Sequence, residues 1–191
     1  MLNFYKLIEI IVCLQSLIIS TMISIYLPLT LIGKSINNFE IPITWQIPTV
    51  ILLTLIFNRK VVLMAFSIYI ILGLFILPVF HEGGSIGYLL TPNFGYLLGT
   101  YPLIKIIDNL NKNNKINIWS FLKNGFLAIC AMHLMGILYN LIQLILYNQL
   151  NLFFFNLGKY SSGKIGYHLL MLFPMMLLIK PIKYFKYYKN D

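Results

Sequence analysis

The chain has 191 residues, of which 59% are apolar and only 10% are charged. A soluble domain carries about 25% charged residues, so this chain lacks the polar side chains that would cover a water-exposed surface. We therefore predict an integral membrane protein with one membrane-embedded domain over residues 1–191 and no second, soluble domain. A spanning helix takes about 20 residues, so six spans fit into this length.

The net charge of +9 comes from basic residues that are scattered through hydrophobic sequence. Nucleic-acid binding needs an exposed basic face, so we expect no nucleic-acid partner. Cys13 and Cys130 both lie in apolar runs and show neither a CxxC pair nor a Cys/His spacing. We therefore predict no disulfide, no metal site and no cofactor.

Six apolar runs predict the spanning helices. In chain order they cover residues 7–29, 45–57, 61–80, 86–107, 121–146 and 165–182. The first run is too long for a signal-peptide core and no small-residue cleavage site follows it, so we expect it to be retained. The second run is short and contains Pro48. The expected fold is an all-α integral membrane bundle of six transmembrane helices, with a glycine-rich outer loop between helices 3 and 4.

The distribution of Lys and Arg predicts the orientation of these spans. With the N-terminus inside, eleven of the 14 basic residues fall into inner segments, and only Lys34, Lys159 and Lys164 fall outside. Because basic residues favour the cytoplasmic side, we predict that both termini are cytoplasmic. The chain is expected to be a multi-pass, lipid-embedded protein of the bacterial cell (inner) membrane or of an organellar membrane.

Two patterns resemble enzyme motifs, but neither is complete. Residues 158–164 (GKYSSGK) have the spacing of a phosphate loop, but Ile165 stands where that loop needs Ser or Thr, and a spanning helix follows. His81-Glu82 lacks the second histidine of a zinc-protease motif. The chain has only 5 acidic residues, and the spans hold no carboxylate pair for acid–base chemistry. We predict that the protein is not an enzyme.

Polar residues without charge form a stripe on the fifth span. His133, Gly136, Asn140, Gln143 and Tyr147 recur at spacings that place them on one helical face. Such residues at membrane depth either bind neighbouring helices as hydrogen-bond partners or line a cavity. The stripe as a whole favours a cavity, with Asn140 and Gln143 in its outer half.

The densest signal is residues 77–99, which read LPVFHEGGSIGYLLTPNFGYLLG. Glycines permit unusual backbone angles, so this block suits a re-entrant loop followed by a helix that starts afresh at Pro92. The alternative is simple packing, because Gly95 and Gly99 form a G-x3-G pair that lets two spans touch.

This block resembles the biotin-binding component (BioY) of energy-coupling-factor vitamin transporters, in which an LPVF…GG…G…L…P…GGYL.G block is the most recognisable element. Residues 41–46 (IPITWQ) are similar to the P-I-T-x-Q segment that opens the second helix of that family. The resemblance implies a six-helix fold with a vitamin cavity near the outer surface, closed by the loop between the first two spans. It also implies three partners, which are one transmembrane coupling subunit and two ATPase subunits.

The sixth span departs from the family. There the family carries a P-G-D-x-x-K motif whose Asp and Lys contribute to the ligand pocket, whereas Pro174 is here followed by Met175 and Met176, and Lys180 comes one residue late. Biotin or a related small molecule is the expected ligand. The alternative is a BioY-derived membrane assembly or interaction protein that has lost biotin transport.

Convergence of the polar residues predicts where the ligand lies, between the glycine block and the inner face of the fifth span. The predicted ligand-binding residues are Trp45, Gln46, His81, Gly83, Gly84, Tyr88, Asn93, Asn140, Gln143 and His168. We expect His133, nearer the midplane, to matter less. Ser16, Ser20 and Ser24 recur every four residues on the first span and predict a face for docking the coupling subunit. Alternatively, these hydroxyls bind carbonyls of their own helix.

Overall fold

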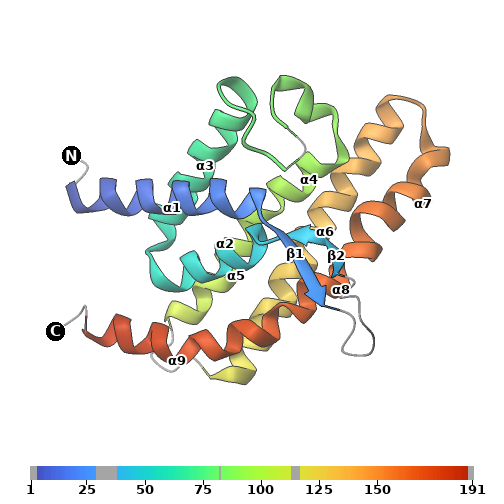
Figure 1. Ribbon diagram of the computed structural model, residues 1–191. Coiled ribbons are helices and arrows are strands. Elements are labelled where there is room, and N and C mark those ends of the chain that lie inside the picture. The colour runs from blue at the N-terminus through green and yellow to red at the C-terminus, as the bar shows by residue number, and fades with distance from the viewer. Residues whose placement is uncertain (1–3, 29–37, 82, 113–116, 189–191) are drawn as a thin grey trace.

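A computed structural model of the chain describes residues 4–28, 38–81, 83–112 and 117–188 (Figure 1). Within these residues the fold is mainly helical, and six helical regions occupy the six apolar runs of the sequence. They are α1 (Phe4–Met22), α2 (Gln46–Ile56), α3 (Arg59–Phe75), the consecutive α4 (Pro92–Leu98) and α5 (Thr100–Lys112), α6 (Ile118–Leu146), and the consecutive α8 (Gly163–Leu170) and α9 (Leu172–Tyr188). The predicted helical bundle is confirmed at this level.

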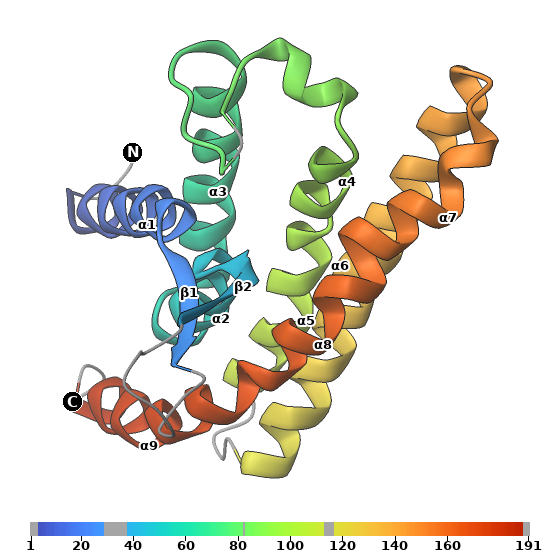
Figure 2. The same cartoon turned by 45° about the vertical axis from the view of Figure 1, so that its right-hand side comes forward.

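The helices form a bundle in which α1 lies crosswise over α3, and the column of α4 and α5 stands between α3 and α6 (Figure 2). By length and composition, α1 and α6 qualify as membrane spans among the described helices. Helix α2 has 11 residues and extends only about 16 Å, well short of the roughly 30 Å of a bilayer core. Large apolar side chains are nevertheless exposed on α3, α6 and α9, for example Ile71, Leu146 and Leu177. Such a surface fits contact with lipid rather than water.

The first helix ends earlier than the sequence predicts. It stops at Met22, and the chain continues as strand β1 (Ser24–Pro28), which pairs antiparallel with β2 (Asn38–Thr44). The expectation of an entirely helical fold with a first span to residue 29 is therefore wrong in this segment. Ile41 and Ile43 are buried with Ile25 against Tyr167 and Met171, as alternate residues of a strand share one face. Pro28 and Pro42 also disfavour a helix, and a two-stranded ribbon tolerates them because both strands are edges.

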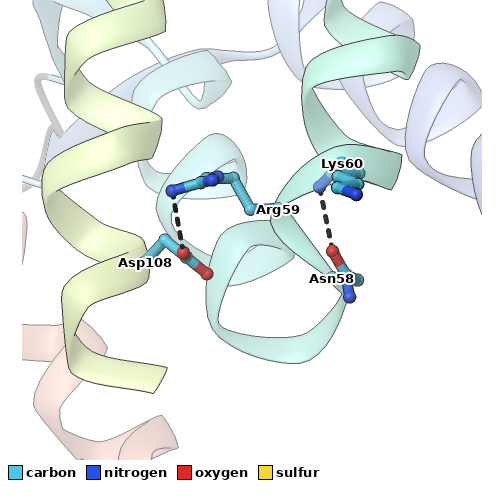
Figure 3. Close-up of polar contacts among 4 residues, drawn as sticks. All are labelled: Asn58, Arg59, Lys60 and Asp108. Atoms are coloured by element: carbon cyan, nitrogen blue, oxygen red, sulfur yellow. Dashed lines mark hydrogen bonds and ion pairs between the residues drawn. The ribbon is translucent and has the colours of Figure 1, made fainter. Parts of the chain in front are cut away.

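The turn that opens α3 is held by polar contacts (Figure 3). The Asn58 side chain caps the helix by accepting the backbone N–H of Lys60 at 3.0 Å. Arg59 Nη1 lies 3.5 Å from Oδ2 of Asp108 on α5, so this ion pair joins the start of α3 to α5. The glycine-rich connection that follows α3 lies at the opposite end of that helix (Figure 2).

The glycine-rich block forms the expected loop and broken helix start. After α3 the chain turns back so that Phe80 pairs with Gly83, whose positive φ of 113° favours glycine. A short 3₁₀-helix, η1 (Ile86–Leu90), follows, and α4 then begins at Pro92 in the first helical turn. The predicted fresh start at Pro92 is confirmed.

Close packing of α4 against α6 depends on glycine at position 99. A Cβ there would meet the backbone oxygen and Cα of Met132 on α6, and a backbone atom cannot move aside as a flexible side chain can. The G-x3-G pair thus has the packing role of the alternative interpretation, since a Cβ at Gly95 would meet the side chain of Tyr139 on α6.

Candidate ligand-binding site

A cavity of about 100 Å³ lies where β2, the glycine block, α4, α6 and α8 meet. It is lined by Pro42, Ile43, Thr44, Gln46, Ile47, His81, Tyr88, Asn93, Tyr96, Leu97, Thr100, Met132, Tyr160, Lys164 and His168. Small-molecule pockets usually hold about 300 Å³ or more, so the walls must separate before a ligand of vitamin size fits. The mixture of apolar walls with a few polar groups is typical of such sites.

Lys164 supplies the charge of this cavity. Among the described residues that line it, Lys164 is the one with a charged side chain, and none carries a carboxylate. Its ammonium lies 5.7 Å from the centre of the Tyr160 ring, within the range of a cation–π contact. A half-buried cation between neutral polar groups favours an anionic group of a ligand, such as a carboxylate.

An unusual helical turn positions the residues around Lys164. The chain passes from α7 (Phe153–Asn156) through a π-helical turn, η3 (Leu157–Ser162), into α8. Position 163 requires glycine, because a Cβ there would lie 2.8 Å from the carbonyl oxygen of Gly158. This turn brings Tyr160 to the cavity and Ser161 to α6, and π-helical turns of this kind occur frequently at functional sites.

Two amides lie on the cavity wall and are held from different elements. Gln46 begins α2, and its Nε2 donates to the hydroxyl of Tyr69 at 3.3 Å. That hydroxyl donates in turn to the carbonyl oxygen of Val79 at 3.3 Å, which fixes the ring. Asn93 lies in the first turn of α4, directly after Pro92. Both amides can offer a donor and an acceptor to a planar polar ligand.

Two histidines extend the polar wall into the protein. Nδ1 of His133 on α6 lies 3.0 Å from the Ser161 hydroxyl, and its Nε2 lies 3.1 Å from Nδ1 of His168. His133, Ser161 and His168 are buried, and Tyr96 packs edge-on against the His133 ring with the ring centres 5.4 Å apart. Of the three, His168 reaches the cavity.

Comparison with known sequences and structures identifies the fold family. A sequence model of the BioY family matches residues 2–165, most of the chain. The chain belongs to the BioY family. Its resemblance in the glycine block and in residues 41–46 is thereby confirmed at the level of the family.

Individual relatives of this BioY chain are more distant. A protein of Lysinibacillus sphaericus described as a probable biotin transporter BioY is 38% identical over 87 residues, and the match covers 44% of each chain. The crystal structure of the S-component for biotin from an ECF-type ABC transporter superposes with a TM-score of 0.59 at 16% identity, over 94% of this chain and 95% of that one. That superposition shows a shared fold.

Half of the predicted ligand-binding residues line the cavity of the BioY chain. These are Gln46, His81, Tyr88, Asn93 and His168. Trp45 lies outside the lining, 39% exposed, with its backbone N–H donating to the carbonyl of Ile23. Gly83 and Gly84 form the turn before η1 instead, and a Cβ at Gly84 would lie 2.6 Å from Cα of Pro78. Their role in the described residues is to let the loop close on itself.

Asn140 and Gln143, in the C-terminal half of the α6 stripe, do not belong to the cavity lining. Asn140 is buried, and its Oδ1 accepts from Nδ2 of Asn156 on α7 at 3.1 Å. Gln143 donates through Nε2 to the carbonyl oxygen of Leu89 in η1 at 2.9 Å, and the Tyr139 hydroxyl donates to the same oxygen. These side chains therefore join α6 to its neighbours, which was the alternative interpretation of the stripe.

The predicted serine face is only partly present. Ser24 lies in β1 beyond the end of the helix, so the three serines do not share one helical face as predicted. Ser20 is buried and its hydroxyl donates to the carbonyl of Leu17, whereas Ser16 is half-buried and its hydroxyl donates to the carbonyl of Val12.

Sequence reasoning missed Tyr96, Thr100, Tyr160 and Lys164, which line the cavity together with Thr44. A signal for the first two exists, because Asn93, Tyr96 and Thr100 follow a helical spacing on α4 and α5. The sequence pattern of residues 158–164 resembles an incomplete phosphate loop, and the charge distribution predicts Lys164 only as an outer basic residue. The spacing of Tyr160, Lys164 and His168, four residues apart each, could have placed them on one face.

Proposed function

We propose that this BioY chain is the membrane-embedded biotin-binding component of an energy-coupling-factor ABC-type uptake transporter. The observation that carries the proposal is the cavity, in which a single lysine faces neutral amide, hydroxyl and imidazole groups across apolar walls. Biotin combines a carboxylate, which needs a cation, with a ureido ring, which needs both donors and acceptors. The names borne by the related transporter and by the S-component of similar fold support the same ligand.

Lys164 offers the cavity a cation in place of the family's lysine, which the sixth span lacks. The Asp and Lys of the family motif are missing after Pro174, but Lys164 brings a cation to the cavity from the start of the same helical region. We propose that Lys164 binds the carboxylate of biotin, and that Asn93 and Gln46 bind the ureido ring.

The partners follow from the proposed role. A binding component without a nucleotide site needs one transmembrane coupling subunit and two ATPase subunits to drive uptake. Ser16 is half-buried on α1, and large apolar side chains such as Ile8 and Ile19 are exposed on the same helix, so this side of α1 suits a helix of the coupling subunit. We propose six membrane crossings with both termini cytoplasmic.

Titration calorimetry on the purified protein in detergent tests the function. Biotin should bind at micromolar concentration or tighter, and mass spectrometry of small molecules released from the untreated protein should detect it. Absence of biotin binding at micromolar concentration would overturn the proposal and favour a BioY-derived assembly or interaction protein. Copurification with an ATPase pair would support the transporter, and stable association with another membrane complex would support the alternative.

A further inference from the structure

A chain of hydrogen bonds leads from Ser161 through His133 to His168 and ends at the cavity. Its two contacts measure 3.0 Å and 3.1 Å. The remaining ring nitrogen of His168, Nε2, has no partner among the described residues, yet none of their buried side-chain nitrogen or oxygen atoms lacks a hydrogen bond. Nε2 must therefore be open, and the open space beside His168 is the cavity.

This chain of hydrogen bonds allows two arrangements of protons, because a neutral imidazole carries one proton, which can be on either of its two nitrogens. In the first, Ser161 donates to Nδ1 of His133, Nε2–H of His133 donates to Nδ1 of His168, and Nε2–H of His168 is a donor toward the cavity. In the second, every hydrogen bond is reversed and Nε2 of His168 is an acceptor. The two rings and the hydroxyl therefore change together.

We propose that Ser161 and His133 position His168 as a hydrogen-bond donor to an acceptor oxygen of the ligand. Ser161 and His133 are positioning residues, and His168 is the residue that contacts the ligand. This inference deepens the proposed function and rests on it. In biotin the acceptor is either a carboxylate oxygen or the ureido carbonyl oxygen.

Lys164 determines which of the two arrangements is used. Lys164 and His168 lie four residues apart on α8, so they share one face of the helix, and both line the cavity. An ammonium group is only a donor and attracts acceptor oxygens. A ligand oxygen drawn to this end of the cavity therefore meets His168 with its Nε2–H as donor. The neighbouring Tyr160 ring and the edge-on Tyr96 ring enclose the same end.

Binding of biotin to variants separates positioning from mere structural support. His168→Leu should weaken binding about 5- to 150-fold, since it removes the contact. His133→Leu should weaken it within the same range although His133 does not line the cavity, in contrast to the expectation from the sequence that His133 matters less. Ser161→Ala should weaken it by about 2- to 10-fold. The double variant His133→Leu/His168→Leu should bind no more weakly than His168→Leu alone, because both act through one nitrogen. Ser162→Ala is the matched control, since that hydroxyl is exposed and binds only Leu157 within its own turn.

The ring protons can be observed directly. The chain has 3 histidines, so ¹⁵N-histidine NMR of the protein with biotin gives few signals, and the His81→Gln and His168→Leu variants assign them. Protonated and unprotonated ring nitrogens differ widely in ¹⁵N shift. With biotin bound, Nε2 of both His133 and His168 should carry the proton, and Ser161→Ala should shift this pattern.

Two analogues identify the ligand oxygen. If the carboxylate is the acceptor, the penalty of His133→Leu should be smaller for biotin methyl ester, whose carbonyl oxygen is only a neutral acceptor, and should persist in full for 2-iminobiotin, in which a nitrogen replaces the ureido oxygen. If the ureido oxygen is the acceptor, the reverse should hold. Unchanged biotin affinity in His133→Leu, an additive double variant, or an unprotonated Nε2 on bound His168 would overturn the positioning role while leaving the proposed function intact. No biotin binding by the unaltered protein would overturn both.

Discussion

Replacing Lys164 by methionine removes the charge of the cavity and keeps most of the side-chain volume. Lys164 is half-buried in a lining of apolar, hydroxyl, amide and imidazole groups. If its ammonium binds the biotin carboxylate, the lost interaction is a charge-assisted hydrogen bond of about 1.5–3 kcal/mol. Biotin affinity of Lys164→Met should therefore fall about 10- to 150-fold.

Titration calorimetry with biotin and with biotin methyl ester gives the decisive comparison. The ester lacks the negative charge, so Lys164→Met should bind it about as well as the unaltered protein does. Lys159→Met is the matched control, because Lys159 also lies near the Tyr160 ring, at 5.0 Å, but is exposed and outside the cavity lining. Equal losses for biotin and its ester, or a loss as large in Lys159→Met, would show that Lys164 does not bind the carboxylate.

Further expectations concern the rest of the cavity, the core and α1. Asn93→Leu should weaken biotin binding about 5- to 150-fold in calorimetry. Asn140→Leu should instead lower the free energy of unfolding by about 1–3 kcal/mol, because Asn140 binds another side chain and does not line the cavity. A larger loss of biotin affinity in Asn140→Leu than in Asn93→Leu would contradict the placement of the site. Gly99→Ala should lower the melting temperature in detergent, since the added Cβ meets the backbone of Met132. Gly166→Ala should not lower it, since open space surrounds that position, and equal melting temperatures of the two variants would refute the close helix contact. Ser16→Leu should reduce copurification of the coupling subunit without altering biotin affinity, and an intact complex would exclude this face as the docking surface.

The apolar runs predicted where helices lie but not every backbone conformation within them. The run over residues 121–146 agrees closely with α6, because a long uninterrupted apolar segment has no competing structure. Residues 24–28 belong to the first apolar run, yet they form β1, since periodicity alone cannot distinguish a short apolar strand from the end of a helix. The partner that decides between them, β2, lies on the far side of a connection whose geometry the sequence does not reveal.

The sequence predicted those residues of the candidate site whose position at the start of a helix fixes where they lie. Asn93 follows Pro92 at a helix start, and Gln46 opens α2, so both could be placed at one end of the bundle. Asn140 was expected at the ligand because its helical face was known, but periodicity does not tell which neighbour covers that face. The position of Lys164 at the cavity was not predicted, because the π-helical turn before it has no recognisable sequence pattern.

Two walls of the cavity, one formed by η1 and α4 and the other by β2, differ in how many contacts hold them to the rest of the protein. The wall of η1 and α4 is joined to α6 by two side-chain hydrogen bonds on the Leu89 carbonyl and by backbone contact at Gly99. The wall of β2 rests on a separate small cluster in which Ile25, Ile41 and Ile43 are the buried members. Local opening costs the least free energy where the fewest buried contacts are lost, so we expect the β1–β2 ribbon to open before the helical wall. If the proposed ligand enters on the side of the ribbon, amide hydrogen exchange in β2 should slow more than exchange in α4 when the ligand binds.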